Sequence, residues 1–263
     1  MQNETIAIHA GYNKKEGYGT MSVPISQTTA YAFRDSEHAA NLFALKELGP
    51  IYTRLNNPTT DVLEQRFAAL EGGAAAICTS SGQAASFYAI ANVAEAGDNI
   101  LISDKLYGGS VTLLTYTMKR FGITAKVFKS DDASDLESLI DDKTKAIYFE
   151  SLSNPQIAIP DVEKVVEIAK KHGVLTICDN TVASAALFNP IKWGIDVVVH
   201  STSKYTNGQG TAIGGIVVER DGLAEFFKAN SNRYSHFTTP DESYHGLIYT
   251  DVPLPNFCLR IRL

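Results

Sequence analysis

Short apolar runs alternate with amphipathic stretches along most of the chain. Seven runs rich in aliphatic and β-branched side chains predict buried strands, at residues 74–79, 99–103, 125–128, 146–149, 174–178, 195–199 and 213–218. Between most of them, apolar residues recur at helical spacing, notably at residues 82–96, 110–121 and 160–172. This alternation predicts an α/β fold in which a mostly parallel seven-stranded sheet lies between helices.

Two more helices are expected before the first strand. Apolar residues repeat at helical spacing from Asp61 onward, and Gly72 would end that helix. Asp61, with Glu64 three positions later, predicts its N-terminal cap. Residues 36–48 could form the other helix, with their apolar residues on one side.

The two ends of the chain lack this regular pattern. Residues 1–58 mix glycines with aromatic residues, and an arm that cannot bury itself often packs on a second subunit, which would make Tyr52 and Arg54 available to a neighbour. Residues 59–240 are expected to form the main domain, and residues 241–263 the start of a truncated C-terminal one. The sequence ends in what resembles an interrupted amphipathic helix, so we expect it to be a fragment.

Composition narrows the class of protein. The 263 residues are 44% apolar and 20% charged, as in ordinary globular proteins, and the net charge of −6 disfavours nucleic-acid binding. We find no apolar run of the roughly 20 residues that span a bilayer, and no secretion signal at the N-terminus. Three widely spaced cysteines fit reduced, buried residues, so we expect a cytoplasmic protein that binds neither membranes nor nucleic acid.

A lysine follows the predicted strand at residues 195–199. Lys204 in this position is usually a solvated end-cap, but Ser201 and Ser203 place two hydroxyl groups beside its amine. The glycines that follow would let the backbone approach a ligand closely: Gly208, Gly210, Gly214 and Gly215. An amine beside hydroxyl groups could form a Schiff base with an aldehyde whose phosphate the hydroxyls bind, and pyridoxal phosphate is such an aldehyde.

A carboxylate ends the preceding strand. The pyridine ring of pyridoxal phosphate acts as an electron sink only while its nitrogen is protonated, so a carboxylate should lie beside it. Asp179 follows the strand at residues 174–178, where it could equally cap a turn. With Lys204 it would face one crevice at the carboxyl edge of a parallel sheet, and the pair is stronger evidence than either residue alone.

Three further segments carry candidate chemistry. Ser81 and Gly82 begin a predicted helix, where free backbone N–H groups could bind phosphate or a serine could simply cap the helix. Tyr107 could stack on a flat cofactor or pack over its own loop. Asn154 could bind a cofactor oxygen or start a turn, and His200 is expected to be structural.

Other classes of site have little support. The six histidines show no metal-ligand spacing, and we find no zinc-protease, Cys-x-x-Cys or phosphate-loop lysine motif. Gly208 and Gly210 lack the third glycine of a dinucleotide-binding fingerprint, so NAD binding is a weak competitor. We therefore expect no metal.

These motifs occur in an order that resembles the Cys/Met-metabolism family of pyridoxal-phosphate enzymes, which have fold type I, the aspartate-aminotransferase-like fold. The residues that carry the resemblance are segment 196–205 with Gly208 and Gly210, Tyr52-Thr53-Arg54, Asn57-Pro58-Thr59, Ser81-Gly82-Gln83, Tyr107-Gly108-Gly109 and Asp179-Asn180-Thr181. Three other segments are most similar to O-acetylhomoserine sulfhydrylases: His9–Tyr12, Lys46–Gly49 and Pro240–His245.

The resemblance implies a role for each site residue. Lys204 would form the Schiff base and carry protons at Cα and Cβ of the substrate, Asp179 would hold the ring nitrogen, and Tyr107 would stack on the ring. The phosphate group would be bound by residues from two segments: Ser81, Gly82, Gln83, Ser201 and Ser203. Asn154 would contact the cofactor hydroxyl or the substrate. Members are generally homotetramers in which Tyr52 and Arg54 reach in from an adjacent subunit.

The implied reaction is a γ-replacement of O-acetyl-L-homoserine by sulfide, which gives L-homocysteine and acetate. A γ-lyase or γ-synthase of the same family is the alternative, as is a truncated module that holds the cofactor without turnover. Gln83 and Gln209 depart from the methionine and histidine common in the family. The family's C-terminal domain supplies an arginine for the substrate carboxylate, and this chain ends before it, so either the sequence is a fragment or that anchor is missing.

Overall fold

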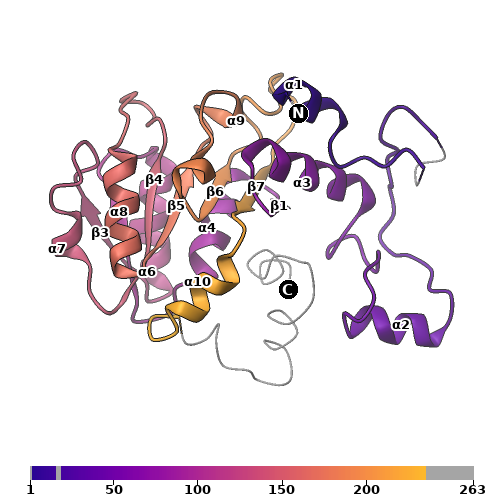
Figure 1. Ribbon diagram of the computed structural model, residues 1–263, viewed down its shortest axis with the longest axis horizontal. Coiled ribbons are helices and arrows are strands. Elements are labelled where there is room, and N and C mark those ends of the chain that lie inside the picture. The colour runs from indigo at the N-terminus through magenta and orange to yellow at the C-terminus, as the bar shows by residue number, and fades with distance from the viewer. Residues whose placement is uncertain (1, 16–18, 235–263) are drawn as a thin grey trace.

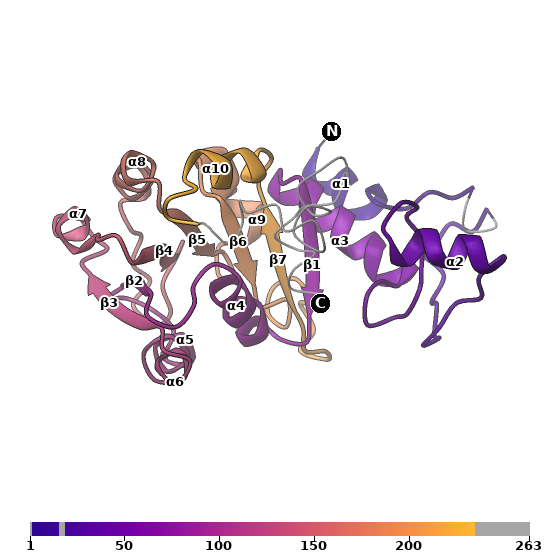
Figure 2. The same cartoon turned by 90° about the horizontal axis from the view of Figure 1, so that it is seen from below.

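A seven-stranded sheet with helices on both faces forms the body of the protein (Figures 1 and 2). The computed structural model describes residues 2–15 and 19–234. The strands are β1 (Ala75–Thr79), β2 (Asn99–Ser103), β3 (Thr124–Phe128), β4 (Thr144–Glu150), β5 (Leu175–Asp179), β6 (Val197–His200) and β7 (Gly215–Glu219). Their order in the sheet is β1-β7-β6-β5-β4-β2-β3.

Only β7 runs against its neighbours among these strands. It pairs antiparallel with β1 and with β6, whereas the other four pairings are parallel. The mostly parallel α/β sheet is therefore confirmed, and the seven strands lie within two residues of their predicted bounds. Because β1 runs parallel to β6, the carboxyl ends of six strands lie at one edge of the sheet.

Helices separate most of the consecutive strands along the chain. They are α1 (Asn3–His9), α2 (Ser36–Phe43), α3 (Pro58–Glu71), α4 (Gly82–Ala91), α5 (Gly108–Thr112), α6 (Met118–Arg120), α7 (Leu136–Leu139), α8 (Val162–His172), α9 (Ser184–Leu187) and α10 (Leu223–Ala229). A π-helical turn (Leu113–Thr117) joins α5 to α6, and a 3-10 turn (Pro190–Trp193) precedes β6. The predicted helix at residues 110–121 thus forms as three consecutive helical pieces.

The start of α3 corrects one prediction. Asn57, not Asp61, is the N-terminal cap, because its side chain accepts the Thr59 N–H at 2.9 Å. Glu64 does not return to the helix start. It is buried and accepts the Cys78 N–H at 2.8 Å, which ties α3 to β1.

Three other helices are shorter than predicted. α2 ends at Phe43, and Leu45 then adopts a left-handed backbone with φ of 54°. α4 ends at Ala91, five residues before the expected 96. α8 begins at Val162 with Asp161 as its cap, so Pro160 lies just outside the helix.

The two faces of the sheet bury different helices. Ile102, Tyr148, Ile177 and Val199 belong to the core that also contains α4, while Phe149 and Cys178 belong to the core under α8. Side chains alternate between the faces along a strand. At the ends of β5 and β6, Asp179 therefore points to the α4 face, and His200 to the opposite one.

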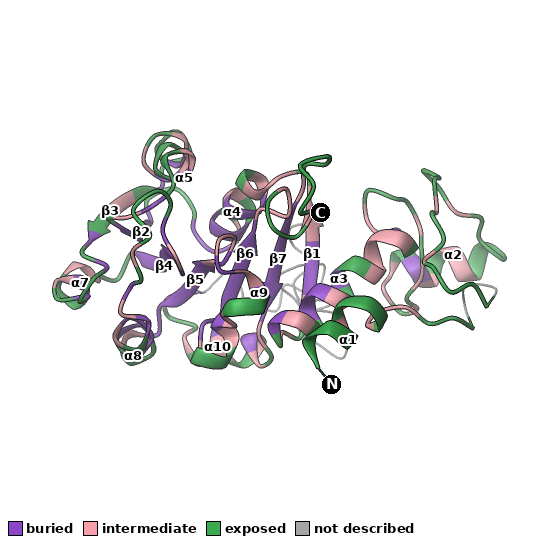
Figure 3. Cartoon of the chain, turned by 90° about the horizontal axis from the view of Figure 1, so that it is seen from above, coloured by how far each residue is buried: buried purple, intermediate pink, exposed green. Residues whose placement is uncertain are grey.

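The N-terminal arm extends away from the sheet, and much of it is exposed (Figures 1 and 3). An isolated antiparallel β-bridge joins Ala30 to Tyr52 within it. The predicted domain limits at residues 58 and 240 remain predictions, and segment 241–263 lies outside the described residues. Cys78 and Cys178 are free thiols, and Cys258 is also outside that range. Within residues 2–15 and 19–234, no helix is long and apolar enough to cross a membrane.

Candidate active site

Most of the predicted site residues lie at the carboxyl edge of the sheet. Asp179 ends β5, Ser201 directly follows β6, and Ser81 directly precedes α4 after β1. Tyr107 precedes α5 after β2, and Asn154 lies in the loop after β4. Segments far apart in the sequence therefore meet at this edge, as in other open α/β sheets that bind ligands.

Asp179 is held by hydrogen bonds from its own turn and from β4. Its Oδ1 accepts the backbone N–H of Thr181 at 3.0 Å and the Thr181 hydroxyl at 2.5 Å. Its Oδ2 accepts the Tyr148 hydroxyl at 3.3 Å, while Ser86 pairs with the same hydroxyl at 2.9 Å. Burial, followed by the charge of Asp179, raises the pKa of Tyr148 well above its usual value, so the phenol stays protonated.

The start of α4 packs directly on the turn after β6. A Cβ added at Gly82 would lie 2.5 Å from Ser201 Cβ and 2.9 Å from Ser201 Oγ, so only glycine permits this approach. Ser81 caps α4 by accepting the Ala84 N–H at 3.1 Å. The N–H groups of Gly82 and Gln83 lie in the first turn, where a helix offers no intrahelical acceptor.

Thr181 connects Asp179 to this candidate phosphate-binding site at Ser201 and the start of α4. Its hydroxyl donates to Asp179 and accepts the N–H of Ser201 at 2.8 Å. One threonine therefore fixes the distance between the carboxylate and the serine turn. The motif Asp179-Asn180-Thr181 contained this residue, but sequence reasoning gave it no role.

Lys204 lies in the turn that begins at Ser201. Its N–H donates to the Ser201 carbonyl at 3.1 Å, and its carbonyl accepts the Gly208 N–H at 2.8 Å. The Lys204 side chain is exposed, and its Nζ forms no hydrogen bond or ion pair with the residues that the structure describes. Ser203 anchors the turn because its hydroxyl bonds both the carbonyl and the N–H of Gly214, at 3.2 and 3.0 Å.

The glycines after Lys204 have structural roles within the chain itself. Gly215 packs on the backbone of Ser81, where a Cβ would lie 2.1 Å from the carbonyl oxygen, and Gly214 packs on Thr202. Gly208 and Gly210 adopt left-handed backbones with φ of 70° and 66°. Gly214 and Gly215 thus permit close approach between chain segments, and Gly208 and Gly210 form tight turns. The approach of this backbone to a ligand remains a prediction.

Tyr107 and Asn154 are both tied to a residue that sequence reasoning missed. Glu150, at the end of β4, accepts the Tyr107 N–H at 2.6 Å and the Asn154 N–H at 3.0 Å. Burial raises the pKa of Glu150 to about 7, and the charge of Asp179 adds to the increase. The Tyr107 side chain is 51% exposed and lies close to Gly109. It is thus not buried by its own loop.

His200 has a structural partner on the opposite face, as expected. Its Nε2 lies 2.6 Å from Glu71 Oε1, and the Asn180 amide donates to the same oxygen at 3.1 Å. Glu71 and His200 are almost completely buried, and Phe67 packs edge-on against the imidazole. This group holds the tips of β5 and β6 from below the site.

Tyr52 and Arg54 do not join the other site residues in this single chain. Both are exposed on the arm, where the Arg54 guanidinium lies 5.7 Å from the Tyr52 ring centre. Among the described residues, no hydrogen bond or ion pair connects them to the strand tips. Their predicted role across a subunit boundary remains a prediction.

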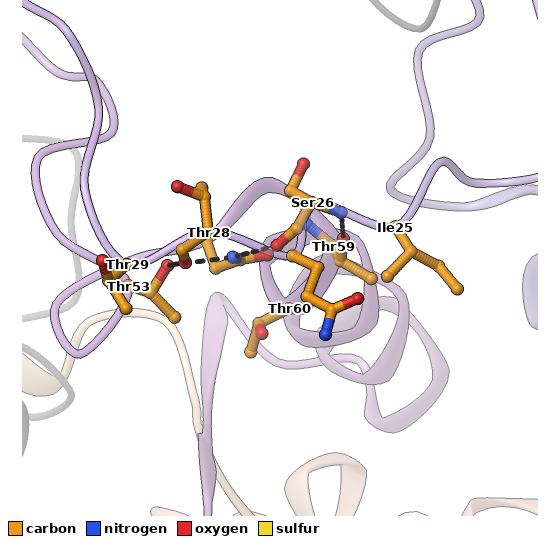
Figure 4. Close-up of a pocket in the computed structure, with 9 residues that line it drawn as sticks. Ile25, Ser26, Thr28, Thr29, Thr53, Thr59 and Thr60 are labelled. Carbon is orange, nitrogen blue, oxygen red and sulfur yellow. Dashed lines mark hydrogen bonds between the residues drawn. The ribbon is translucent and has the colours of Figure 1, made fainter.

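A hollow of about 680 Å³ lies at the arm and not at the strand tips (Figure 4). Six of its lining residues carry a hydroxyl group: Ser26, Thr28, Thr29, Thr53, Thr59 and Thr60. Several of its polar groups bond one another: Ser26 N–H to Thr59 Oγ1 at 2.8 Å, and the Asn57 amide to the Ser26 carbonyl at 2.9 Å. These bonds dock the arm on the start of α3.

The residues at the carboxyl edge fit pyridoxal phosphate. The first turn of α4 and Ser201, brought together by Gly82, match a phosphate group. Asp179 keeps one oxygen on Thr181 and the other near a neutral phenol, so it can hold a cationic ring nitrogen. Lys204 supplies an exposed amine. Within the described chain, no group of three or more histidine, cysteine or acidic residues could hold a metal ion.

Comparison with known proteins defines the class. The family of Cys/Met metabolism PLP-dependent enzymes matches residues 4–247, and this chain belongs to that family. Pyridoxal phosphate is the cofactor of this family. The family match confirms the resemblance and the cofactor predicted from the sequence, and the structure confirms the predicted fold class.

The individual proteins to which this chain is similar include O-acetylhomoserine sulfhydrylases and a related lyase. A putative O-acetylhomoserine (thiol)-lyase from Campylobacter jejuni, solved with a pyridoxyl-lysine monophosphate, is 54% identical with a TM-score of 0.94 over 99% of this chain and 64% of its own. O-acetyl-L-homoserine sulfhydrylase of Leptospira meyeri is 47% identical over 95% of this chain, and a sulfhydrylase of Fusarium oxysporum is 48% identical over 99%. The chain spans 55% of the first of these two and 60% of the second.

Proposed function

We propose that the protein is a pyridoxal-phosphate-dependent O-acetylhomoserine sulfhydrylase. The reaction breaks the Cγ–O bond of O-acetyl-L-homoserine, forms a Cγ–S bond to sulfide, and yields L-homocysteine and acetate. The observation that carries the proposal is the packing of Gly82 on Ser201, with Thr181 linking Ser201 to Asp179. The relatives named above support the choice of substrate.

When bound, pyridoxal phosphate supplies an electron sink for negative charge at the substrate's Cα and Cβ. The chain's own residues would hold it at its two ends. The α4 N–H groups, Ser201 and Ser203 would bind the phosphate, and Asp179 would keep the ring nitrogen protonated. Tyr107, about half exposed, would cover one face of the ring and exclude water from it.

Lys204 would perform the proton transfers. Its amine lies on a turn fixed at both ends, by Thr181 at Ser201 and by Gly214 at Ser203. This one nitrogen could take protons from Cα and Cβ and, once sulfide has replaced acetate at Cγ, return protons to the same two carbons. Asn154 would bind the cofactor hydroxyl or the substrate.

We also propose a cytoplasmic homotetramer in which pairs of subunits share active sites. The exposed arm supports this assembly, because among the described residues no hydrogen bond or ion pair joins Tyr52 or Arg54 to the strand tips of their own chain. A neighbouring subunit would supply both residues to the phosphate end of the site. Sedimentation of the full protein, with and without residues 1–58, tests the assembly.

Trapping of the cofactor tests the lysine. Purified protein should be yellow with pyridoxal phosphate, and borohydride should fix the cofactor covalently to the wild type but not to Lys204→Ala. Lys119→Ala, at an exposed position on α6, is the matched control and should trap normally. Equal trapping in Lys204→Ala would remove the lysine assignment.

Product analysis tests the reaction. Homocysteine and acetate formed by full-length protein from O-acetyl-L-homoserine and sulfide would support the proposal. Oxobutyrate with ammonia would indicate a γ-lyase instead. Cofactor binding without any turnover would indicate a non-catalytic module.

A further inference from the structure

Glu150 connects two loops at the candidate site. Its Oε1 accepts the N–H of Tyr107, which lies 43 residues earlier in the chain, and its Oε2 accepts the N–H of Asn154. Glu150 is 5% exposed, so water cannot easily replace either bond. A single carboxylate therefore sets the position of the predicted stacking residue relative to the predicted amide ligand.

The same carboxylate lies beside Asp179. Glu150 and Asp179 are partners in the β4–β5 register and point to the α4 face of the sheet. Burial first and the charge of Asp179 second raise the pKa of Glu150 to about 7, while its two N–H donors act in the opposite direction. Burial first and the charge of Asp179 second raise the pKa of Tyr148 on the same strand and of Cys178 on the opposite face, and the charge of Glu150 adds to both increases. Asp179 is the charged group that acts on Glu150.

Protonation would change what Glu150 can do. An ionised carboxylate accepts hydrogen bonds at both oxygens, whereas a protonated carboxyl carries a hydrogen on one of them. The protonated form can then accept only one of the two backbone N–H groups. One of the two loops would lose its anchor near neutral pH.

We propose that Glu150 is a positioning residue whose ionised carboxylate holds the Tyr107 and Asn154 turns in the arrangement that binds pyridoxal phosphate. This inference rests on the proposed function and adds a residue that touches neither cofactor nor substrate. It acts through the backbone of two residues that do.

The affinity for pyridoxal phosphate at several pH values tests the role. Glu150→Gln keeps the shape but replaces one acceptor by an amide donor at every pH. Glu167→Gln, on the exposed side of α8, removes a carboxylate away from the site. We expect Glu150→Gln to raise the cofactor dissociation constant about tenfold near pH 8.5, as for one lost hydrogen bond. Near pH 5.5, where the wild-type carboxyl is itself protonated, the two constants should agree within about twofold.

The test compares the cofactor dissociation constant of Glu150→Gln with that of the wild type at each pH, expressed as their ratio. A ratio that stays about tenfold at all pH values would show a purely structural role and overturn the proposal, as would a ratio near one throughout. A wild type that binds no cofactor at any pH would overturn the proposed function together with this inference. Glu167→Gln should match the wild type at each pH.

Hydrogen exchange provides a readout that needs no variant. In cofactor-free wild type, one of the two amides, that of Tyr107 or that of Asn154, should lose protection as the pH falls below about 7, relative to the Ala84 amide bound to Ser81. Constant relative protection of both amides from about pH 5.5 to about 8.5 would also overturn the proposal.

Discussion

Substitution of Gly82 by alanine has two opposite effects on stability: a gain in helix propensity and a steric conflict with Ser201. Gly82 is the first residue of α4, and its φ lies in the range of ordinary residues, so alanine meets no backbone strain there. By helix propensity alone, Gly82→Ala would stabilise the protein by about 0.5–1 kcal/mol. The added Cβ, however, would lie 2.5 Å from Ser201 Cβ and 2.8 Å from Ser201 Cα. No rotamer change can relieve a contact with the backbone.

Steric conflict should win at this position. Overpacking typically costs about 1–3 kcal/mol, so the net effect should be a loss of roughly 1 kcal/mol in the free energy of unfolding. The conflict must push the start of α4 and Ser201 apart, which would separate two of the proposed phosphate-binding groups. We expect the dissociation constant for pyridoxal phosphate to rise on the order of tenfold or more.

Gly108→Ala is a matched control. Gly108 also begins a helix, α5, and a Cβ there would have no atom within 4 Å. Its urea midpoint should therefore stay equal or rise, whereas that of Gly82→Ala should fall. Urea denaturation of the cofactor-free proteins and titration with pyridoxal phosphate measure both quantities. If Gly82→Ala matched Gly108→Ala in stability and the wild type in cofactor affinity, the close packing on Ser201 would have no energetic role.

Three further predictions address the groups around the site. Thr181→Val should weaken cofactor binding about tenfold by removing a charge-assisted bond to Asp179, while Thr181→Ser should not; fluorescence titration compares them. Glu71→Ala should lower the free energy of unfolding in urea by about 1–3 kcal/mol, because it leaves the buried His200 imidazole without its hydrogen-bond partner, and an unchanged free energy of unfolding would contradict this. The folded-state pKa of Glu150 is raised from 4.5 to about 7, so folding is favoured most while this carboxyl is protonated. This contribution to the free energy of unfolding is complete below about pH 4.5 and is lost as the pH rises through about 7. Urea titrations should show up to about 3 kcal/mol of this decrease in wild type and a flatter profile in Glu150→Gln.

The sequence was informative where a reactive group follows a buried run. Asp179 and Lys204 could be found because each follows an apolar strand, and parallel strands bring their carboxyl ends to one edge. Glu150 also follows such a strand, but a single glutamate at a strand end is normally solvated, and no pattern shows that it is buried. Tyr148 was hidden inside an apolar run, where an aromatic residue reads as core.

Local competition explains the errors in the helices and turns. Asn57 and Asp61 are both good capping residues, and Asn57 won because the Pro58 that follows it suits the first turn of a helix. At Gly214 and Gly215, the sequence cannot show that Thr202 and Ser81 lie against the two glycines. Contacts between segments this far apart depend on the completed sheet.

At the ends of β5 and β6, adjacent residues bond partners on opposite faces of the sheet, so the two faces are connected through the backbone. Asp179 and Asn180 are neighbours in sequence, yet Asp179 serves the candidate site while Asn180 bonds Glu71 beneath it. His200 and Ser201 divide in the same way, because His200 also bonds Glu71 and Ser201 receives Thr181. Because Asn180 and His200 each share a peptide plane with a site residue, a displacement of Glu71 would act on the residues next to both Asp179 and Ser201. A buried acid that no substrate reaches is therefore subject to the same geometric demands as the site above it.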